Sequence, residues 1–331
     1  MRRTTDSTTT SEDVASGIGR RAFLAGVSVA AVGAWAGQPA AATSARPVRF
    51  DLAGVPRVLV YEAQLASPTV LQSFAFDAGG RLFTAQLLAG TPGTSGDLCL
   101  THLGPDGTVL GSMVLRGAGH GVAFAAQSVG GETYLWTETA ANTNGYGTRL
   151  ARFAWRDGAE YTAGDPALTV VNLVPEALET TCSIDPVHER LAVRYHTPTG
   201  KRFAVFRLAD AVRAAETQEV PGRLADFPQP SGLGTFQGYA LLGDVLYVYE
   251  GNSYGPTNPP PGNAFLGAVD VATGRLVERL LVDAADELPF REPEGLAIGR
   301  LPGGKPFLGL GFASGVVGDR RATILALSKT L

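Results

Sequence analysis

The chain has 331 residues, of which 45% are hydrophobic and 18% are charged, and its formal net charge is −4. This balance is sufficient for a large buried core and excludes an intrinsically disordered chain. The sequence has no clustered run of lysine or arginine of the kind that binds phosphate backbones, so we expect no nucleic-acid partner.

The first 42 residues have the features of an export signal and not of a folded segment. A leader rich in serine and threonine runs to Gly19, the twin arginine Arg20-Arg21 is followed by Phe-Leu, and an apolar run from Leu24 to Trp35 leads to three alanines at 40–42. The twin arginine is typical of a Tat signal, although Gly19 stands where Ser or Thr is usual. About a dozen apolar residues are too few to span a bilayer, so a transmembrane anchor is the weaker alternative.

Cleavage after Ala42 would remove four basic and three acidic residues, which leaves 23 basic and 28 acidic residues and a net charge of −5. No second long apolar segment follows. We therefore expect a secreted or wall-associated monomer that reaches its location by the Tat pathway and has no membrane span after cleavage. Residues 43–54 are expected to form a linker, and residues 55–331 a single domain.

Beyond the linker, one pattern occurs five times. Each copy begins with a polar residue and a small one, runs through a short apolar strand, turns, and continues into a second apolar strand. The copies span residues 72–86, 120–138, 182–196, 237–250 and 294–312, and their first residues are 48, 62, 55 and 57 residues apart. Further strands follow each copy, so a period offers about four strands, which is typical of propeller blades.

The last copy is followed by one further strand only, at 322–328, whereas a β-rich segment at 55–63 precedes the first copy. An incomplete blade would leave an unpaired sheet edge, which natural sheets cover or avoid. We therefore predict an all-β fold, a five-bladed β-propeller closed by pairing of the N-terminal strand with residues 322–328. In blade three we expect a short helix at 208–216 and an outer strand at 218–220.

In such a propeller the innermost strands would direct their first residues into the central channel. These residues are Gln72, His120, Cys182, Gln237 and Glu294. The second cysteine, Cys99, lies in what we interpret as a different blade. An exported chain permits a disulfide, but both cysteines lie in apolar strands, where free cysteine behaves as a small buried hydrophobe. The sequence favours free thiols and leaves the pairing to be decided by distance.

Several motifs in the first half of the domain resemble a known family. They are QSF at 72–74, GDLCLT at 96–101, LRGAGHG at 115–121, LWTE at 135–138 and GYGTRL at 145–150. They resemble the propeller shared by teichoic acid biosynthesis protein C, helveticin-J-type bacteriocins and receptor-binding proteins of some phages. The resemblance covers most of residues 72–327 and implies a wall-facing propeller whose ligand is an anionic polyol-phosphate polymer or its sugar decorations. The sequence has no nucleotide fingerprint and no phosphate-cradling glycine loop before a helix, and we expect no cofactor and no metal.

Seven residues are candidates for ligand binding: Gln72, Arg116, His120, Tyr146, Gln237, Tyr254 and Glu294. Glutamine donates and accepts hydrogen bonds at once, which suits sugar hydroxyls. The two tyrosines lie in loops rich in glycine and asparagine, where an aromatic ring is more often a ligand contact. Arginine matches two phosphate oxygens with its guanidinium fork, and Arg149 is a weaker candidate for the same role. Each has a structural alternative, such as hydrogen bonds between blades or an ion pair.

A hydrolase is the alternative function, with His120, Glu138, Glu250 and Glu294 as the catalytic candidates. Glycoside hydrolysis uses two converging carboxyl groups, and Glu292 lies two residues before Glu294. We also expect Glu294 to accept a hydrogen bond from His120 across the channel. The sequence favours a binding module over a hydrolase. A bacteriocin-like effector, which rests on family analogy alone, is a weaker third alternative.

Overall fold

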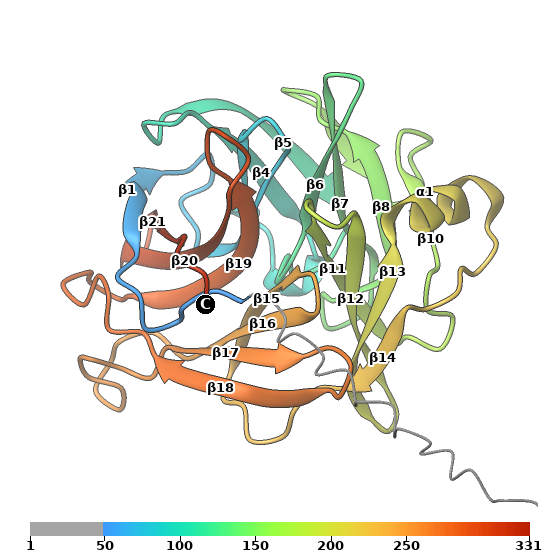
Figure 1. Ribbon diagram of the computed structural model, residues 1–331. Coiled ribbons are helices and arrows are strands. Elements are labelled where there is room, and N and C mark those ends of the chain that lie inside the picture. The colour runs from blue at the N-terminus through green and yellow to red at the C-terminus, as the bar shows by residue number, and fades with distance from the viewer. Residues whose placement is uncertain (1–48) are drawn as a thin grey trace, which may run out of the picture. The chain divides into compact units, whose positions relative to one another are not determined.

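Residues 49–331 are described by the computed structural model, which begins within the predicted linker. The predicted signal peptide and its twin arginine lie outside the described residues. Within the described range, five β-sheets are arranged around a common axis (Figure 1). No helix in this range has the length and apolar composition that crossing a membrane requires.

Each sheet contains a meander of four antiparallel strands whose first strand is innermost. The innermost strands are β2 (Leu71–Phe76), β6 (Ala125–Val129), β11 (Glu179–Asp185), β15 (Phe236–Leu242) and β19 (Glu292–Arg300). The second strands are β3 (Leu82–Leu87), β7 (Glu132–Ala141), β12 (Arg190–Thr197), β16 (Val245–Glu250) and β20 (Pro306–Val316). The third strands are β4 (Leu98–Leu103), β8 (Gly147–Ala154), β13 (Gly200–Arg207), β17 (Phe265–Asp270) and β21 (Asp319–Leu327). The outermost strands are β5 (Val109–Arg116), β10 (Thr169–Val171), β14 (Ala225–Pro228), β18 (Arg275–Leu281) and β1 (Arg57–Gln64).

The innermost strands form a continuous ring. Each contacts the innermost strand of the next blade, and β19 contacts β2. The side chains between neighbouring blades form the apolar core, in which β16, for example, is buried along its whole length. The predicted five-bladed propeller is confirmed.

The fifth blade takes its outermost strand from the beginning of the described chain. β1 runs antiparallel to β21, with Arg57 opposite Ala326 and Gln64 opposite Arg321. Next to this pair, the backbone N–H of Asp51 donates to the carbonyl of Lys329 at 2.9 Å. The pairing predicted for residues 55–63 and 322–328 is therefore observed.

Two details of the outer strands differ from the prediction. The helix α1 (Leu208–Thr217) is present, but it ends at Gln218 in a left-handed backbone conformation, and the outer strand of blade three is β14 and not residues 218–220. The short strand β9 (Glu160–Thr162) was not predicted and adds to blade one, parallel to β5. Three residues without a hydrophobic alternation carry too weak a signal for a strand prediction.

Both cysteines are free thiols, as the sequence favours. Cys99 and Cys182 are buried in different blades, and burial raises the pKa of each thiol. The Cys182 sulfur contacts the carbonyl of Trp136 at 3.5 Å. Its side chain is completely buried, so the predicted ring of channel-facing residues receives no cysteine from blade three.

Candidate ligand-binding site at the channel mouth

Three of the five predicted channel residues lie at β-bulges. The register between β2 and β3 shifts around Gln72, that between β15 and β16 around Gln237, and that between β19 and β20 around Glu294. A bulge leaves one residue out of the ladder and changes the direction of its side chain. All three side chains line one cavity at the mouth where the inner strands begin.

The glycines that follow Gln237 and Glu294 are required by close packing. A Cβ atom on Gly238 would lie 2.8 Å from the Cα atom of Gly295, and a Cβ atom on Gly295 would lie 2.8 Å from the Cα atom of Ser73. The inner strands of blades four, five and one therefore touch backbone to backbone at this level. This contact explains the repeated polar-small pair and brings the three bulged side chains to one place.

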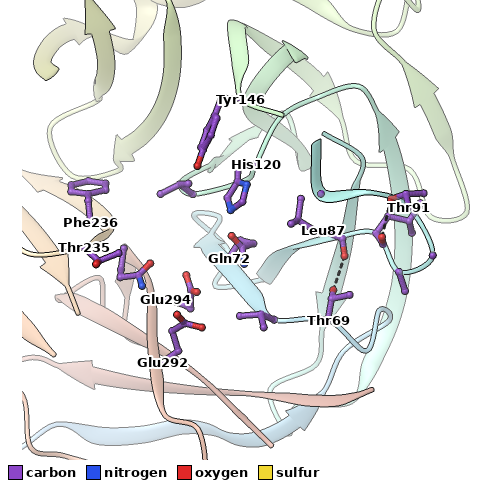
Figure 2. Close-up of a pocket in the computed structure, with 17 residues that line it drawn as sticks. Thr69, Gln72, Leu87, Thr91, His120, Tyr146, Thr235, Phe236, Glu292 and Glu294 are labelled. Atoms are coloured by element: carbon purple, nitrogen blue, oxygen red, sulfur yellow. Dashed lines mark hydrogen bonds between the residues drawn. The ribbon is translucent and has the colours of Figure 1, made fainter. Parts of the chain in front are cut away.

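The cavity has a volume of ≈ 550 Å³. Figure 2 shows Gln72, His120, Glu292 and Glu294 directed toward its interior. The sequence did not single out several other lining residues: Thr69, Val70, Leu87, Leu88, Ala89, Gly90, Thr91, Gly93, Val122, Thr235 and Phe236. Further along the channel the walls are apolar, with Phe76, Phe124 and Ile298 around a space of only ≈ 10 Å³.

His120 does not begin an inner strand, contrary to the prediction. It lies in the loop before β6, which starts at Ala125, and reaches the cavity from there. The Ser73 hydroxyl donates to the carbonyl of Gly121 and ties this loop to β2. The imidazole stacks on Tyr146 with ring centroids 5.1 Å apart. Burial lowers the pKa of His120, so the ring is neutral at pH 7 and offers one donor and one acceptor.

Glu294 is a buried carboxyl group, 5% exposed. Burial raises its pKa well above the usual range, and the neighbouring Glu292 raises it further. Burial also raises the pKa of Glu292, which Arg320 opposes. A raised pKa favours the protonated form of a carboxyl group, which donates a hydrogen bond as well as accepting one.

The polar atoms at the bottom of the cavity have few partners within the protein. Gln237 donates from Nε2 to the carbonyl of Gly251 at 3.0 Å. Among the described residues, the side chains of Gln72, His120 and Glu294 make no hydrogen bond to protein, and the hydrogen bond predicted between His120 and Glu294 is absent (Figure 2). These donors and acceptors are available to a ligand.

Glu138, a catalytic candidate from the sequence, holds backbone groups instead of lining the main cavity. Its Oε1 accepts from the N–H of Gly121 at 2.6 Å, and its Oε2 accepts from the N–H of Gly147 at 2.5 Å. A Cβ atom on Gly119 would lie 2.2 Å from the Glu138 carboxyl carbon. Gly119 therefore makes room for Glu138, not for the imidazole, whereas Gly121 has a positive φ of 81°. Burial raises the pKa of Glu138 to about 7, although these hydrogen bonds oppose the shift.

Glu250 has the same role in blade four, since it accepts from Arg279 Nε at 2.6 Å and from the N–H of Gly234. In blade one, Gln86 donates from Nε2 to the carbonyl of Ser67 at 2.7 Å. All three residues lie on second strands and hold the loop that leads into the inner strand. Neither Glu138 nor Glu250 lines the main cavity.

The remaining candidates for ligand binding differ in whether they line the cavity. Arg116 forms ion pairs with Asp97 at 3.1 Å and with Glu160 at 2.7 Å. It therefore has the structural role that the sequence analysis gave as the alternative to ligand binding. The Tyr254 hydroxyl lies 3.4 Å from the carbonyl of Pro261, outside the cavity. Tyr146 alone of these three lines the cavity. Arg149 donates from Nη1 to the neighbouring carbonyl of Thr148 at 2.9 Å.

Residues 70–326 match the family described as "Phage 5-bladed beta propeller receptor binding platform domain". The chain belongs to this family. The resemblance found in the sequence motifs is thereby confirmed. The match spans the five inner strands and all residues that line the cavity except Thr69.

Two individual proteins are also similar to this chain. The Bacillus subtilis (strain 168) protein named "Putative major teichoic acid biosynthesis protein C" is 27% identical over 290 residues, which cover 84% of this chain and 63% of that protein. The chain thus spans less than two thirds of that relative. The tail fiber of Staphylococcus aureus phage P68 has a TM-score of 0.66 at 19% identity, over 83% of this chain and 53% of the fiber. This second likeness shows the shared fold.

Glycosidases resemble the propeller only distantly. The xylan beta-1,4-xylosidase from Bacillus Halodurans C-125 has a TM-score of 0.45 at 11% identity, over 80% of this chain and 54% of the enzyme. A likeness at this level carries no argument about activity, because one fold hosts many functions. The function has to be argued from the site.

Proposed function

We propose that the protein acts outside the cytoplasm and binds a cell-wall polymer in the cavity at the channel mouth. The observation that carries this proposal is the set of polar side chains at the bottom of the cavity, Gln72, His120 and Glu294, which have no hydrogen-bond partner within the described protein. These polar atoms are not among the fully buried side-chain atoms that lack a partner, so a ligand can reach them and replace their hydrogen bonds to water by direct ones. The receptor-binding family and the name of the Bacillus relative support a wall polymer as the ligand.

The chemistry of the cavity favours a sugar over a phosphodiester. The described lining contains no lysine or arginine and contains two carboxyl groups, Glu292 and Glu294. Amides, a neutral imidazole and a protonated carboxyl group each donate and accept hydrogen bonds, as sugar hydroxyls require. Tyr146 and Phe236 add aromatic faces on which a sugar ring can stack. We therefore propose the sugar decoration of a teichoic-acid-like polyol phosphate as the group that enters.

Replacing Gln72 by alanine is expected to weaken binding to a purified, glycosylated wall polymer about tenfold. A tenfold loss of affinity corresponds to about 1.4 kcal/mol, which is the net contribution of a good hydrogen bond to a sugar hydroxyl. The melting temperature should not fall, because Gln72 has no side-chain partner in the described protein. Calorimetric titration and thermal melting measure the two effects.

Two control variants complete this experiment. Gln237→Ala also removes a protein hydrogen bond to Gly251, so it should lower both affinity and melting temperature. Tyr254→Ala removes a ring outside the cavity and should leave binding unchanged. If Tyr254→Ala loses binding while Gln72→Ala keeps it, the ligand sits at the Tyr254 loop and not in the cavity.

A hydrolase of a wall glycan is the second candidate, because two carboxyl groups with raised pKa, Glu292 and Glu294, share one cavity. A general acid needs a raised pKa near neutral pH. Incubation with purified wall polymer, with both retention and product release measured, separates the candidates. Product release that disappears in Glu294→Gln supports the hydrolase, and retention without release supports binding.

We propose export by the Tat pathway on the basis of Arg20-Arg21 and the apolar run after it. Replacing this pair by Lys-Lys is expected to abolish export, measured as the fraction of protein in the wall and medium. The matched control is Arg2-Arg3→Lys-Lys, which makes the same change in the same leader and should export normally. Export of both variants at the parent level would rule out the Tat assignment.

A further inference from the structure

Arg194, in β12, is a buried cation without an acidic partner among the described residues. Arg194 is 7% exposed, and its Nε donates a hydrogen bond to Gln229 Oε1 at 2.9 Å. Its two terminal nitrogens donate to no acceptor in the described protein, and no carboxylate lies within ion-pair distance. Burial lowers the pKa of Arg194 to about 10, so the guanidinium stays charged at neutral pH.

Arg194 lies next to the proposed sugar site. It lines a small cavity of ≈ 30 Å³ that shares Val122 and Tyr146 with the main cavity. Its guanidinium carbon lies 3.9 Å from the ring centroid of Phe236, which lines the main cavity. Since the aromatic ring covers one face of the guanidinium, its free donors lie along its edge.

The acidic groups around this small cavity have partners of their own. Glu138 holds backbone N–H groups, and Glu179 Oε2 lies 2.6 Å from His196 Nδ1. Burial, together with the charges of Arg194 and Lys201, lowers the pKa of His196 to about 4, so its ring is neutral and donates to Glu179. The positive charge of Arg194 is therefore not neutralised by an ion pair. Glu179 and Glu138 act on its charge from a distance but lie beyond ion-pair reach, so an incoming anion is the first direct acceptor for its terminal nitrogens.

We propose that Arg194 is an anion-binding subsite that takes phosphate oxygens of a polyol-phosphate chain while the sugar on that chain occupies the main cavity. The identity of the ligand rests on the function proposed above, whereas the anion site rests on Arg194 itself. A guanidinium edge pairs with two phosphate oxygens. A polar cavity that contains no cation, beside a single arginine, matches a polymer that carries a neutral sugar on an anionic backbone.

The experiment compares glycosylated poly(glycerol phosphate) with the neutral glycosyl-glycerol released from it by hydrogen fluoride. The parent protein is expected to bind the polymer at least about tenfold more tightly than the neutral unit at low salt. Arg194→Gln should lose that advantage and its salt dependence while it binds the neutral unit as the parent does. Arg190→Gln is the matched control, because it makes the same change at the other end of β12, where Arg190 pairs with Asp244 at 2.9 Å, and it should bind both ligands normally.

Two results would overturn the subsite: equal losses of polymer and neutral-unit binding in Arg194→Gln, or an unchanged polymer affinity. Arg194→Met keeps the apolar stem and should melt no lower than the parent without ligand, so a fall of about 5 °C or more makes the residue structural. If the parent binds neither carbohydrate, the proposed function fails, and inorganic phosphate alone then decides the subsite. Phosphate should raise the melting temperature of the parent and of Arg190→Gln but not of Arg194→Gln, and equal shifts in all three contradict the proposal.

Discussion

Glu138→Ala is expected to lower the free energy of unfolding by about 4 kcal/mol, since each buried N–H left without a partner costs about 1–3 kcal/mol and the lost acceptor is a carboxylate. The two N–H groups belong to Gly121 and Gly147, at 2.6 and 2.5 Å from the carboxyl oxygens. The side chain is 1% exposed, so water does not replace it without rearrangement of the loop. Urea unfolding measures the change.

The matched control is Glu132→Ala in the same strand, β7. Its carboxylate lies at the surface and pairs with Arg156 at 3.1 Å, so its removal should change stability by about 0.5 kcal/mol or less. Glu138→Gln keeps one acceptor and should fall between the two. A Glu138→Ala variant as stable as Glu132→Ala would mean that the carboxylate is not the clamp described above. Because the clamp holds the loop of His120, a destabilised variant should also bind wall polymer less tightly.

The architecture was predictable from the sequence because propeller blades repeat. A polar residue, a small residue and two short apolar strands recur every 48 to 62 residues, and the backbone contact at Gly238 and Gly295 is the physical reason for the small residue in blades four and five. The outer strand of the fifth blade followed from the rule that sheet edges are not left open, and β1 pairs with β21 as that rule requires. These features are local patterns or simple counts of strands.

The site was only partly predictable because its residues are defined by their partners. The glycines around His120 resembled the opening of an inner strand, but Gly119 makes room for the carboxyl group of Glu138. The sequence around Arg194, an arginine inside an apolar strand, gives no sign that its charge lacks an ion pair. Glu138 and Glu294 look alike in the sequence, whereas one holds backbone N–H groups and the other faces an open cavity.

The contribution of Glu294 to stability is expected to fall as the pH rises above 4.5. The pKa of Glu294 is raised in the folded protein relative to its usual value of 4.5. Between these two values the folded protein keeps a proton that the unfolded chain has released. Its contribution to stability is therefore fully present below pH 4.5 and is lost as the pH rises toward the folded pKa, by up to about 1.4 kcal/mol per pH unit.

Glu294→Gln is expected to remove this loss, because glutamine resembles the protonated carboxyl group and does not titrate. The variant should melt at a higher temperature than the parent at pH 8, and the difference should grow with pH. Glu138 also lowers stability as the pH rises, because its pKa is raised to about 7, but this effect ends near pH 7. Glu138→Gln measures the contribution of Glu138 separately. The histidines whose pKa is lowered, His102, His120 and His196, act with the opposite sign and only below about pH 6.5, so the comparison is made above that pH. Identical melting curves of the parent and Glu294→Gln across this range would mean that Glu294 is ionised in the fold.

The same proton links stability to binding. A protonated Glu294 donates to a sugar oxygen, whereas an ionised one only accepts and also repels the phosphates of the polymer backbone. Affinity of the parent for neutral glycosyl-glycerol is therefore expected to decline at alkaline pH together with stability, while Glu294→Gln keeps its affinity. Titrations of both proteins from pH 5 to pH 9 test this expectation, and a parallel decline in both would assign the pH dependence to a group other than Glu294.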